Sequence, residues 1–228
     1  MSATRLIHPL SEFNAEIPPE EDGLFERIAC GIESQGYVIL PAALPHPVAD
    51  SLVRYLSLLE EERFHQARIG RGLEQDRNPF IRRDKIYWMD DAHPGASQWF
   101  DWAARLKRYL NRRLFLGLFS FESHFALYHP GDFYKKHLDA FRGESNRVLT
   151  LVTYLNMGWE PGQGGELVVY APDDGDEISK VVPAFGTMVI FLSEEFPHEV
   201  LAADRDRYSV AGWFRINGSI NRQIDPPR

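Results

Sequence analysis

Hydrophobic residues recur at helical spacing in the first half of the chain and at strand spacing in the second half. Three segments, 20–35, 45–62 and 97–116, repeat apolar residues every three or four positions, which predicts amphipathic helices. Two short apolar segments, YVIL at 37–40 and DKIYWM at 84–89, predict strands. The first half is therefore expected to be mainly helical.

After Gly117 the pattern changes to short apolar segments separated by turn residues. Eight strands are predicted there, at 119–129, 133–139, 146–156, 165–171, 178–182, 187–192, 197–201 and 207–216. Short strands at even spacing are typical of a jelly roll. The predicted fold class is mainly β with supporting helices: a double-stranded β-helix (jelly roll, cupin-like) backed by N-terminal α-helices.

The domain organisation is expected to be simple. No internal repeat or linker divides the 228 residues, and all-β domains of this length are common. We predict one domain over 1–228. Residues 1–116 would supply helical support and a loop, residues 117–216 the jelly-roll core, and residues 217–228 a C-terminal tail.

The loop at 66–83, QARIGRGLEQDRNPFIRR, has no hydrophobic periodicity and carries two glycines and five arginines. Long irregular segments inside compact domains are more often functional than idle. A solvated charged loop is the plainer interpretation, and it stays open at this point.

The composition favours a soluble protein in a reducing compartment. The formal net charge of −8 disfavours a general binder of nucleic acid. Cys30 is the single cysteine, which excludes an internal disulfide and a cysteine-based zinc site, so a cytoplasmic location is expected. No apolar segment approaches the roughly 20 residues that span a bilayer, so no membrane partner is expected. We expect a monomer.

His137 and Asp139 form the motif from which the candidate chemistry is built. One residue separates them in YHPGDFYKKHLD, so on a strand their side chains would leave the same face. His198, in FPHEV, supplies a second imidazole. Two histidines and one carboxylate are the ligand set of non-haem Fe(II) oxygenases, which leaves coordination positions open. His-x-Asp also occurs by chance in surface turns. His129 is the rival ligand, with a solvent-facing turn as its commoner environment.

Arg207 begins the last predicted strand, downstream of FPHEV. Its guanidinium could bind a cosubstrate carboxylate through two parallel hydrogen bonds. Period-two alternation places Ser209 and Trp213 on the same face as Arg207. On an earlier strand, Tyr154 shares a face with Thr150. If these faces point inward, one cavity holds the metal ligands and the arginine.

These segments together resemble those of the 2-oxoglutarate- and Fe(II)-dependent oxygenases. The similarity is to the prolyl 4-hydroxylase-like branch, which includes the hypoxia-inducible-factor prolyl hydroxylases and bacterial relatives, and it extends over residues 24–216. The motifs that carry it are IRRDKIYW, YHPGDFYKKHLD, NRVLTLVTYLN, GQGGELVVY, FPHEV and RYSVAGWF. Their order and spacing make the similarity specific.

The resemblance implies a role for each matching residue. His137, Asp139 and His198 would bind Fe(II). Arg207 and Tyr154 would bind the distal carboxylate of the cosubstrate, 2-oxoglutarate. The family also implies O2 as a co-reactant and ascorbate as a candidate reductant.

Further residues would complete the pocket. Tyr128 is similar to a tyrosine that lines the cosubstrate and metal pocket, and Trp213 to a residue of the pocket wall. Ser209 would join Arg207 in the cosubstrate subsite. In close members of the family, the segment matching 66–83 is a mobile lid over a peptide substrate.

Three residues would belong to the substrate lid: Arg82, Asp84 and Arg147. The resemblance suggests an ion pair between Asp84 and Arg147 that links the end of the lid to the sheet. Strict alternation puts Arg147 on the opposite face from Tyr154, so a β-bulge would be needed between them. Collagen-type members carry lysine at the position of Arg207, which argues against a collagen-like substrate.

The expected function is hydroxylation of an exposed proline in a protein substrate, with release of succinate and CO2. Other possibilities remain: a cupin-like dioxygenase without 2-oxoglutarate, an oxygenase acting on another residue, a small molecule or a nucleobase, and a non-catalytic metal-binding jelly-roll module. Arg207 with Ser209 argues against the first, and the complete ligand set argues against the last. The acidic composition argues against a nucleic-acid substrate.

Overall fold

The computed structural model describes residues 19–67, 78, 80–140, 146–173, 175–217, 219–220 and 223–224. The central part of the loop at 66–83 lies outside these residues, so its role as a lid stays a prediction. Most of the tail at 217–228 also lies outside them, apart from the short paired strands β12 (Ser219–Ile220) and β13 (Gln223–Ile224).

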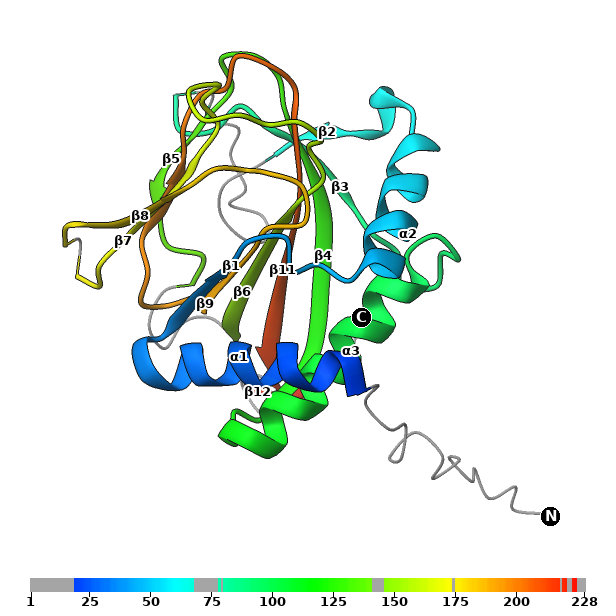
Figure 1. The fold of residues 1–228 in the computed structure, drawn as a ribbon, viewed down its shortest axis with the longest axis vertical. Helices are drawn as coiled ribbons and strands as arrows, with labels where there is room; N and C mark the ends of the chain where they lie inside the picture. The colour runs from blue at the N-terminus through cyan, green and yellow to red at the C-terminus, as the bar shows by residue number, and fades with distance from the viewer. Residues whose placement is uncertain are drawn as a thin grey trace.

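Three α-helices lie on one side of the molecule: α1 (Pro19–Gln35), α2 (His46–Ser57) and α3 (Ser97–Leu114) (Figure 1). The apolar face of each helix is buried, as the helical spacing in the sequence predicts. None of the described helices combines the length and the hydropathy that crossing a membrane requires.

The predicted end of the second helix was wrong. The sequence pattern extends to residue 62, whereas α2 ends at Ser57 and is followed by a short 3-10 helix, η2 (Glu61–Arg63). The reason is burial. Tyr55 is buried on the helix, but Leu58 is 75% exposed, so a further helical turn would gain no apolar contact.

The larger sheet contains seven strands and carries the helices on one face. Their spatial order is β1 (Tyr37–Leu40), β9 (Met188–Leu192), β6 (Arg147–Tyr154), β11 (Arg207–Ile216), β4 (Leu118–Tyr128), β3 (Lys85–Trp88) and β2 (His65–Gln66). All described pairings in this sheet are antiparallel.

The smaller sheet has four antiparallel strands and covers the opposite face. Its order is β5 (Tyr134–His137), β10 (His198–Val200), β7 (Leu167–Tyr170) and β8 (Glu177–Val181). The eight strands predicted after Gly117 are all present, and two facing antiparallel sheets confirm the jelly-roll prediction.

Side-chain alternation along β6 divides the core into two clusters. Leu149 and Leu151 belong to the cluster between the larger sheet and the helices. Val152 and Tyr154 belong to the cluster between the two sheets. Neighbouring residues of a strand point to opposite faces. The leucines of β6 therefore pack against the helices, and the alternate residues of β6 face the space between the two sheets.

Candidate metal centre and cosubstrate pocket

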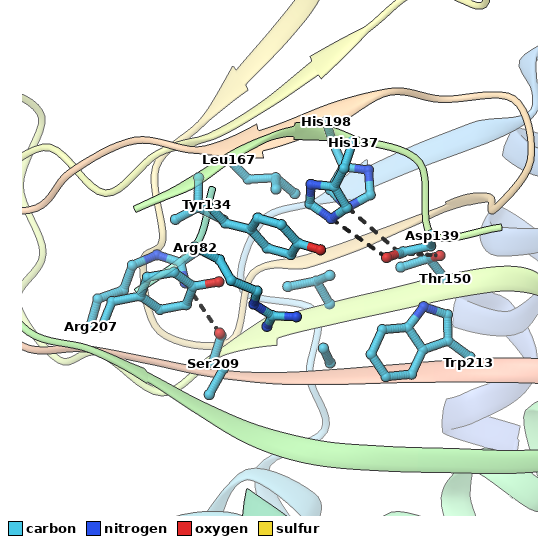
Figure 2. A pocket seen from close by; sticks show the side chains of 15 residues that line it. Arg82, Tyr134, His137, Asp139, Thr150, Leu167, His198, Arg207, Ser209 and Trp213 are labelled. Atoms are coloured by element: carbon cyan, nitrogen blue, oxygen red, sulfur yellow. Dashed lines mark hydrogen bonds and ion pairs between the residues drawn. The ribbon is translucent and has the colours of Figure 1, made fainter. Parts of the chain in front are cut away.

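His137, Asp139 and His198 converge between the two sheets, as Figure 2 shows. His137 ends β5, and Asp139 follows two residues later. His198 begins β10 and lies directly opposite His137 in the antiparallel pairing of these strands. One ligand atom from each residue lies within 4.8 Å of the other two, which is the spacing of a metal-binding group.

Backbone carbonyls fix the tautomer of both imidazoles. Nδ1 of His137 is 2.8 Å from the carbonyl oxygen of Lys135, and Nδ1 of His198 is 3.1 Å from that of Phe196. A carbonyl oxygen only accepts hydrogen bonds, so each Nδ1 must carry the proton. Both Nε2 atoms therefore direct a lone pair toward Asp139.

Each Nε2 atom lies 3.6 Å from an oxygen of Asp139: His137 from Oδ1 and His198 from Oδ2. Three electron-pair donors that face one another in a largely buried space favour a cation between them. Two imidazole nitrogens and one carboxylate suit Fe(II), and the carbonyl contacts at Nδ1 are the outer-shell partners that metal-bound histidines usually have. The donor set fits the metal.

Burial controls the protonation of these groups. It lowers the pKa of His198 to about 4 because a buried imidazolium is poorly solvated, so this ring is a neutral donor near pH 7. Burial alone would raise the pKa of Asp139. The electrostatic interaction with His198, the contact with His137 and the positive charge of Arg147 outweigh burial and hold that pKa well below its usual range. The carboxylate is therefore ionised, as a metal ligand must be.

Thr150 and Ser193 extend the site beyond the three predicted ligands. Thr150 donates a hydrogen bond of 2.8 Å to Oδ2 of Asp139, and the hydroxyl of Ser193 lies 2.9 Å from that of Thr150. Period-two alternation predicts the inward face for Thr150 but no role, and Ser193 was not among the predicted site residues. No local sequence signal identifies Ser193.

A pocket extends from the metal ligands along the inner face of β11. Its lining residues are Arg82, Ala126, Tyr128, Tyr134, His137, Asp139, Thr150, Val152, Leu167, His198, Val200, Arg207, Ser209, Ala211 and Trp213. The alternation that places Arg207, Ser209 and Trp213 on one inward face is confirmed.

Arg207 forms one end of this pocket and is 1% exposed. Its Nε donates to the carbonyl oxygen of Gly165 at 2.7 Å, and Nη1 donates to the hydroxyl of Ser209 at 3.2 Å. The guanidinium carbon lies 4.9 Å from the ring centre of Tyr128 and 5.0 Å from that of Tyr154. The cation is thus held rigidly in an apolar environment, where an anionic ligand would bind strongly.

Tyr154 lies beside Arg207 with a hydroxyl that lacks a hydrogen-bond partner among the described residues. Its side chain is fully buried, and burial raises the pKa of the phenol to about 12, against the opposing charge of Arg207. A buried donor without an acceptor is costly in a folded protein. The carboxylate of a bound ligand would supply the missing acceptor.

The predicted ion pair between Asp84 and Arg147 was wrong. Asp84 is fully buried and accepts two hydrogen bonds from Arg82, at 2.8 and 2.6 Å. Arg147 instead donates to Glu122, at 2.9 and 2.7 Å. Asp84 is satisfied by the guanidinium two residues away in sequence. Nε and Nη2 of Arg147 both donate to one oxygen of Glu122, which lies on β4 beyond the intervening strand β11.

The predicted β-bulge is present on β6. Phe214 pairs with Leu149, whereas the next residue, Arg215, pairs with Arg147, so Val148 is skipped. The bulge brings the guanidinium of Arg147 to 3.8 Å from the ring centre of Trp213. Arg147 therefore contacts Trp213, a residue of the pocket wall, and its carboxylate partner is Glu122.

His129, the rival metal ligand, is outside this site. Its Nδ1 lies 2.9 Å from Asp206 and its Nε2 lies 3.1 Å from Glu61, and the metal-binding group found among the described residues does not include it. The ring is held by carboxylates near the surface.

Comparison with known proteins decides the family. A family model described as the 2OG-Fe(II) oxygenase superfamily matches residues 123–215. The crystal structure of a Pseudomonas putida prolyl-4-hydroxylase is 37% identical in sequence and has a TM-score of 0.75. The similarity covers 85% of this chain and 100% of that one. The chain belongs to the 2OG-Fe(II) oxygenase superfamily. The cofactor and cosubstrate named by this superfamily, Fe(II) and 2-oxoglutarate, fit the donor set and the arginine pocket, and O2 is its co-reactant.

Two further proteins are similar to this chain. Human Egl nine homolog 1 is 27% identical over 150 residues, which are 62% of this chain. The match spans 34% of that relative, about a third of its length. A Trichoplax adhaerens prolyl hydroxylase, solved in complex with a peptide fragment of the hypoxia-inducible-factor oxygen degradation domain, shares the fold, with a TM-score of 0.75 at 23% identity.

Proposed function

We propose that this chain is a 2-oxoglutarate- and Fe(II)-dependent dioxygenase that hydroxylates a prolyl residue of a protein substrate and releases succinate and CO2. The observation that carries the proposal is one pocket with two complementary ends. One end holds the metal-binding triad, and the other holds the buried cation of Arg207 beside the unpartnered hydroxyl of Tyr154.

The triad would hold Fe(II) through His137, Asp139 and His198. Three protein ligands leave up to three positions of an octahedral ion for 2-oxoglutarate and O2. The loaded metal supplies oxidative decarboxylation of 2-oxoglutarate and transfer of one oxygen atom to the substrate. The protein binds, orients and shields the reactants.

Arg207, Ser209 and Tyr154 would bind the distal carboxylate of 2-oxoglutarate. Arg207 provides charge-assisted donors, and its contacts with Gly165 and Ser209 fix the direction of the guanidinium. Tyr154 would donate its hydroxyl proton, which has no other acceptor among the described residues. The subsite is assembled before the ligand arrives, so little ordering is needed on binding.

The substrate would enter beside Tyr134 and Trp213, which line the pocket near the metal ligands. Arg82 and Arg147 stand at this wall, where the guanidinium of Arg82 lies 4.2 Å from the ring centre of Tyr134. Proline suits such a site because its ring is compact and apolar and its φ angle is fixed, so little entropy is lost when one carbon is held in place.

The similarity to the Pseudomonas putida prolyl-4-hydroxylase supports proline as the target, and the Trichoplax prolyl hydroxylase, solved with a protein-derived peptide, supports a protein substrate. The single cysteine, Cys30, supports a reducing, cytoplasmic setting. We also propose ascorbate as a reductant that keeps the iron in the Fe(II) state.

The test has two steps. The purified protein with Fe(II) should convert 2-oxoglutarate to succinate, and a host-cell extract treated with it should yield tryptic peptides with one added oxygen on proline. The matched control is the His198→Ala variant under the same conditions. Oxygen added to asparagine, lysine or a nucleobase, with proline unchanged, would keep the oxygenase and refute the prolyl substrate. Iron binding without succinate formation would favour a non-catalytic module.

A further inference from the structure

Asp139 is connected to two buried hydroxyl groups that the activity described above does not require. Thr150 donates to Oδ2 of Asp139 at 2.8 Å, and the hydroxyl oxygens of Thr150 and Ser193 are 2.9 Å apart. Thr150 is 1% exposed and Ser193 is fully buried, so solvent does not compete for these contacts. Burying two hydroxyl groups lowers the stability of the folded protein unless both are hydrogen-bonded.

Counting protons gives the hydrogen bonds a direction. A hydroxyl group has one proton to donate and lone pairs to accept with, whereas an ionised carboxylate only accepts. Thr150 must use its single proton on Asp139. It therefore accepts the proton of Ser193, and the chain runs from Ser193 through Thr150 to Asp139.

The fold holds both hydroxyls in place. Thr150 lies on β6 between its register partners Trp213 on β11 and Phe191 on β9, so its side chain is fixed on the inner face. Ser193 follows the end of β9, and its backbone N–H donates to the carbonyl oxygen of Val148 at 2.9 Å. Val148 is the bulged residue of β6. The bulge therefore positions the second hydroxyl.

We propose that Ser193 and Thr150 act as a positioning pair for Asp139. Because Thr150 occupies Oδ2, the carboxylate is restrained from rotating and favours binding a metal through one oxygen. One-oxygen binding leaves more coordination positions for 2-oxoglutarate and O2. Among the described residues, the hydroxyl of Ser193 is hydrogen-bonded to Thr150 and not to a metal ligand, so it acts by orienting the Thr150 proton.

This inference rests on the proposed metal centre, and metal binding alone tests it. Apo-protein is titrated with Co(II), whose visible absorption reports the ligand geometry, and the dissociation constant is measured without 2-oxoglutarate or substrate. Four forms are compared with the wild type: Thr150→Val, Thr150→Ser, Ser193→Ala and the double variant Thr150→Val/Ser193→Ala. Thermal unfolding of each apo form verifies that it is folded.

Thr150→Val removes the hydroxyl at nearly constant volume and should weaken Co(II) binding by roughly 10- to 100-fold, the range found for outer-shell partners. It should also shift the absorption bands. Thr150→Ser keeps a hydroxyl and should restore both properties. Ser193→Ala should weaken binding by roughly 2- to 10-fold, the effect of one ordinary hydrogen bond.

The double variant separates positioning from packing. Because Ser193 acts through Thr150, its loss should not change Co(II) affinity further once Thr150 is valine. Losses of Co(II) affinity that add in the double variant would refute the positioning role of Thr150 and Ser193. An unchanged affinity and spectrum in Thr150→Val would refute it as well, and neither result would contradict the metal centre. A wild-type protein that binds neither Co(II) nor Fe(II) would overturn the metal centre and this inference together.

Discussion

His137 and His198 face each other across the antiparallel pairing of β5 and β10. The ring centres are 4.3 Å apart, and each ring is oriented by a backbone carbonyl so that its Nε2 faces Asp139. The two imidazoles therefore project from directly paired residues of neighbouring strands. The pairing sets the separation of the two backbone positions, and the carbonyl contacts set the direction of each ring.

Iron binding should depend on both members of this pair. We expect His137→Ala and His198→Ala to lose nearly all bound iron and all turnover, because the two remaining ligands bind the metal too weakly. The fold should survive in both variants. Atomic absorption measures the iron content. His129→Ala is the matched control and should keep its iron, since that ring is engaged by Asp206 and Glu61. Near-full iron occupancy in either ligand variant would contradict the assignment.

Binding of 2-oxoglutarate should depend on Arg207. Hydrogen bonds to charged groups contribute about 1.5–3 kcal/mol each, so Arg207→Ala should weaken 2-oxoglutarate binding roughly 10- to 1,000-fold. Tyr154→Phe should have a smaller effect, because it removes one neutral donor. Calorimetry measures the affinity, and iron should remain bound in both variants.

Arg207 is also buried and bonded to Gly165, so Arg207→Lys is needed as a control that keeps the charge in place. We expect Arg207→Lys to bind more tightly than Arg207→Ala and more weakly than the wild type, because lysine lacks the planar fork. Equal 2-oxoglutarate affinity in the wild type and Arg207→Ala would remove this residue from the cosubstrate subsite.

Stability should fall on the acid side because of His124. This ring is 5% exposed, between Trp88 and Trp213 at centroid distances of 5.0 and 5.2 Å. Burial, with a smaller contribution from the positive charge of Arg82, lowers its pKa from 6.5 to about 4. Between these values the unfolded chain binds a proton that the folded chain does not. The stability contributed by His124 is thus present above about pH 6.5 and is lost as the pH falls toward 4.

The expected loss is about 3 kcal/mol in the free energy of unfolding, from the size of the pKa shift. Urea unfolding at a series of pH values measures it. His124→Phe keeps an aromatic ring that has no proton to bind, so its stability should fall less between pH 6.5 and 4. Parallel curves for the two proteins would show that His124 is not the group responsible.

Gly164 should tolerate no side chain. Its φ angle is +71°, and an added Cβ would collide with the backbone oxygen of Ala202. Gly131, with φ of +83° and open space around it, is the matched control. The left-handed backbone alone costs about 1–2 kcal/mol, so Gly131→Ala should lose about that amount and Gly164→Ala clearly more. Equal losses by urea unfolding would show that the segment before β7 can move away.

The sequence alone determined the main helices and strands and the direction of their side chains, but not the end of α2 or the short elements η2 and β2. Period-two alternation on β11 was enough to put Arg207, Ser209 and Trp213 on one inward face. The His-x-Asp spacing was enough to join His137 and Asp139, because neighbours on one strand face depend only on local geometry. The strand order of the jelly roll then implied that His198 would join them.

Only the tertiary structure decided which polar groups pair with one another. Asp84 was expected to bind Arg147 but instead binds Arg82. The guanidinium of Arg82 reaches Asp84, whereas that of Arg147 is bound by the carboxylate of Glu122. The link from Ser193 to Asp139 depends on the register of β6 and β9 and on the bulge at Val148. The contacts of Arg147 with Glu122 and of Thr150 with Ser193 join strands that are distant in sequence, where a shift of one residue exchanges inner and outer faces, so local periodicity carries no record of them.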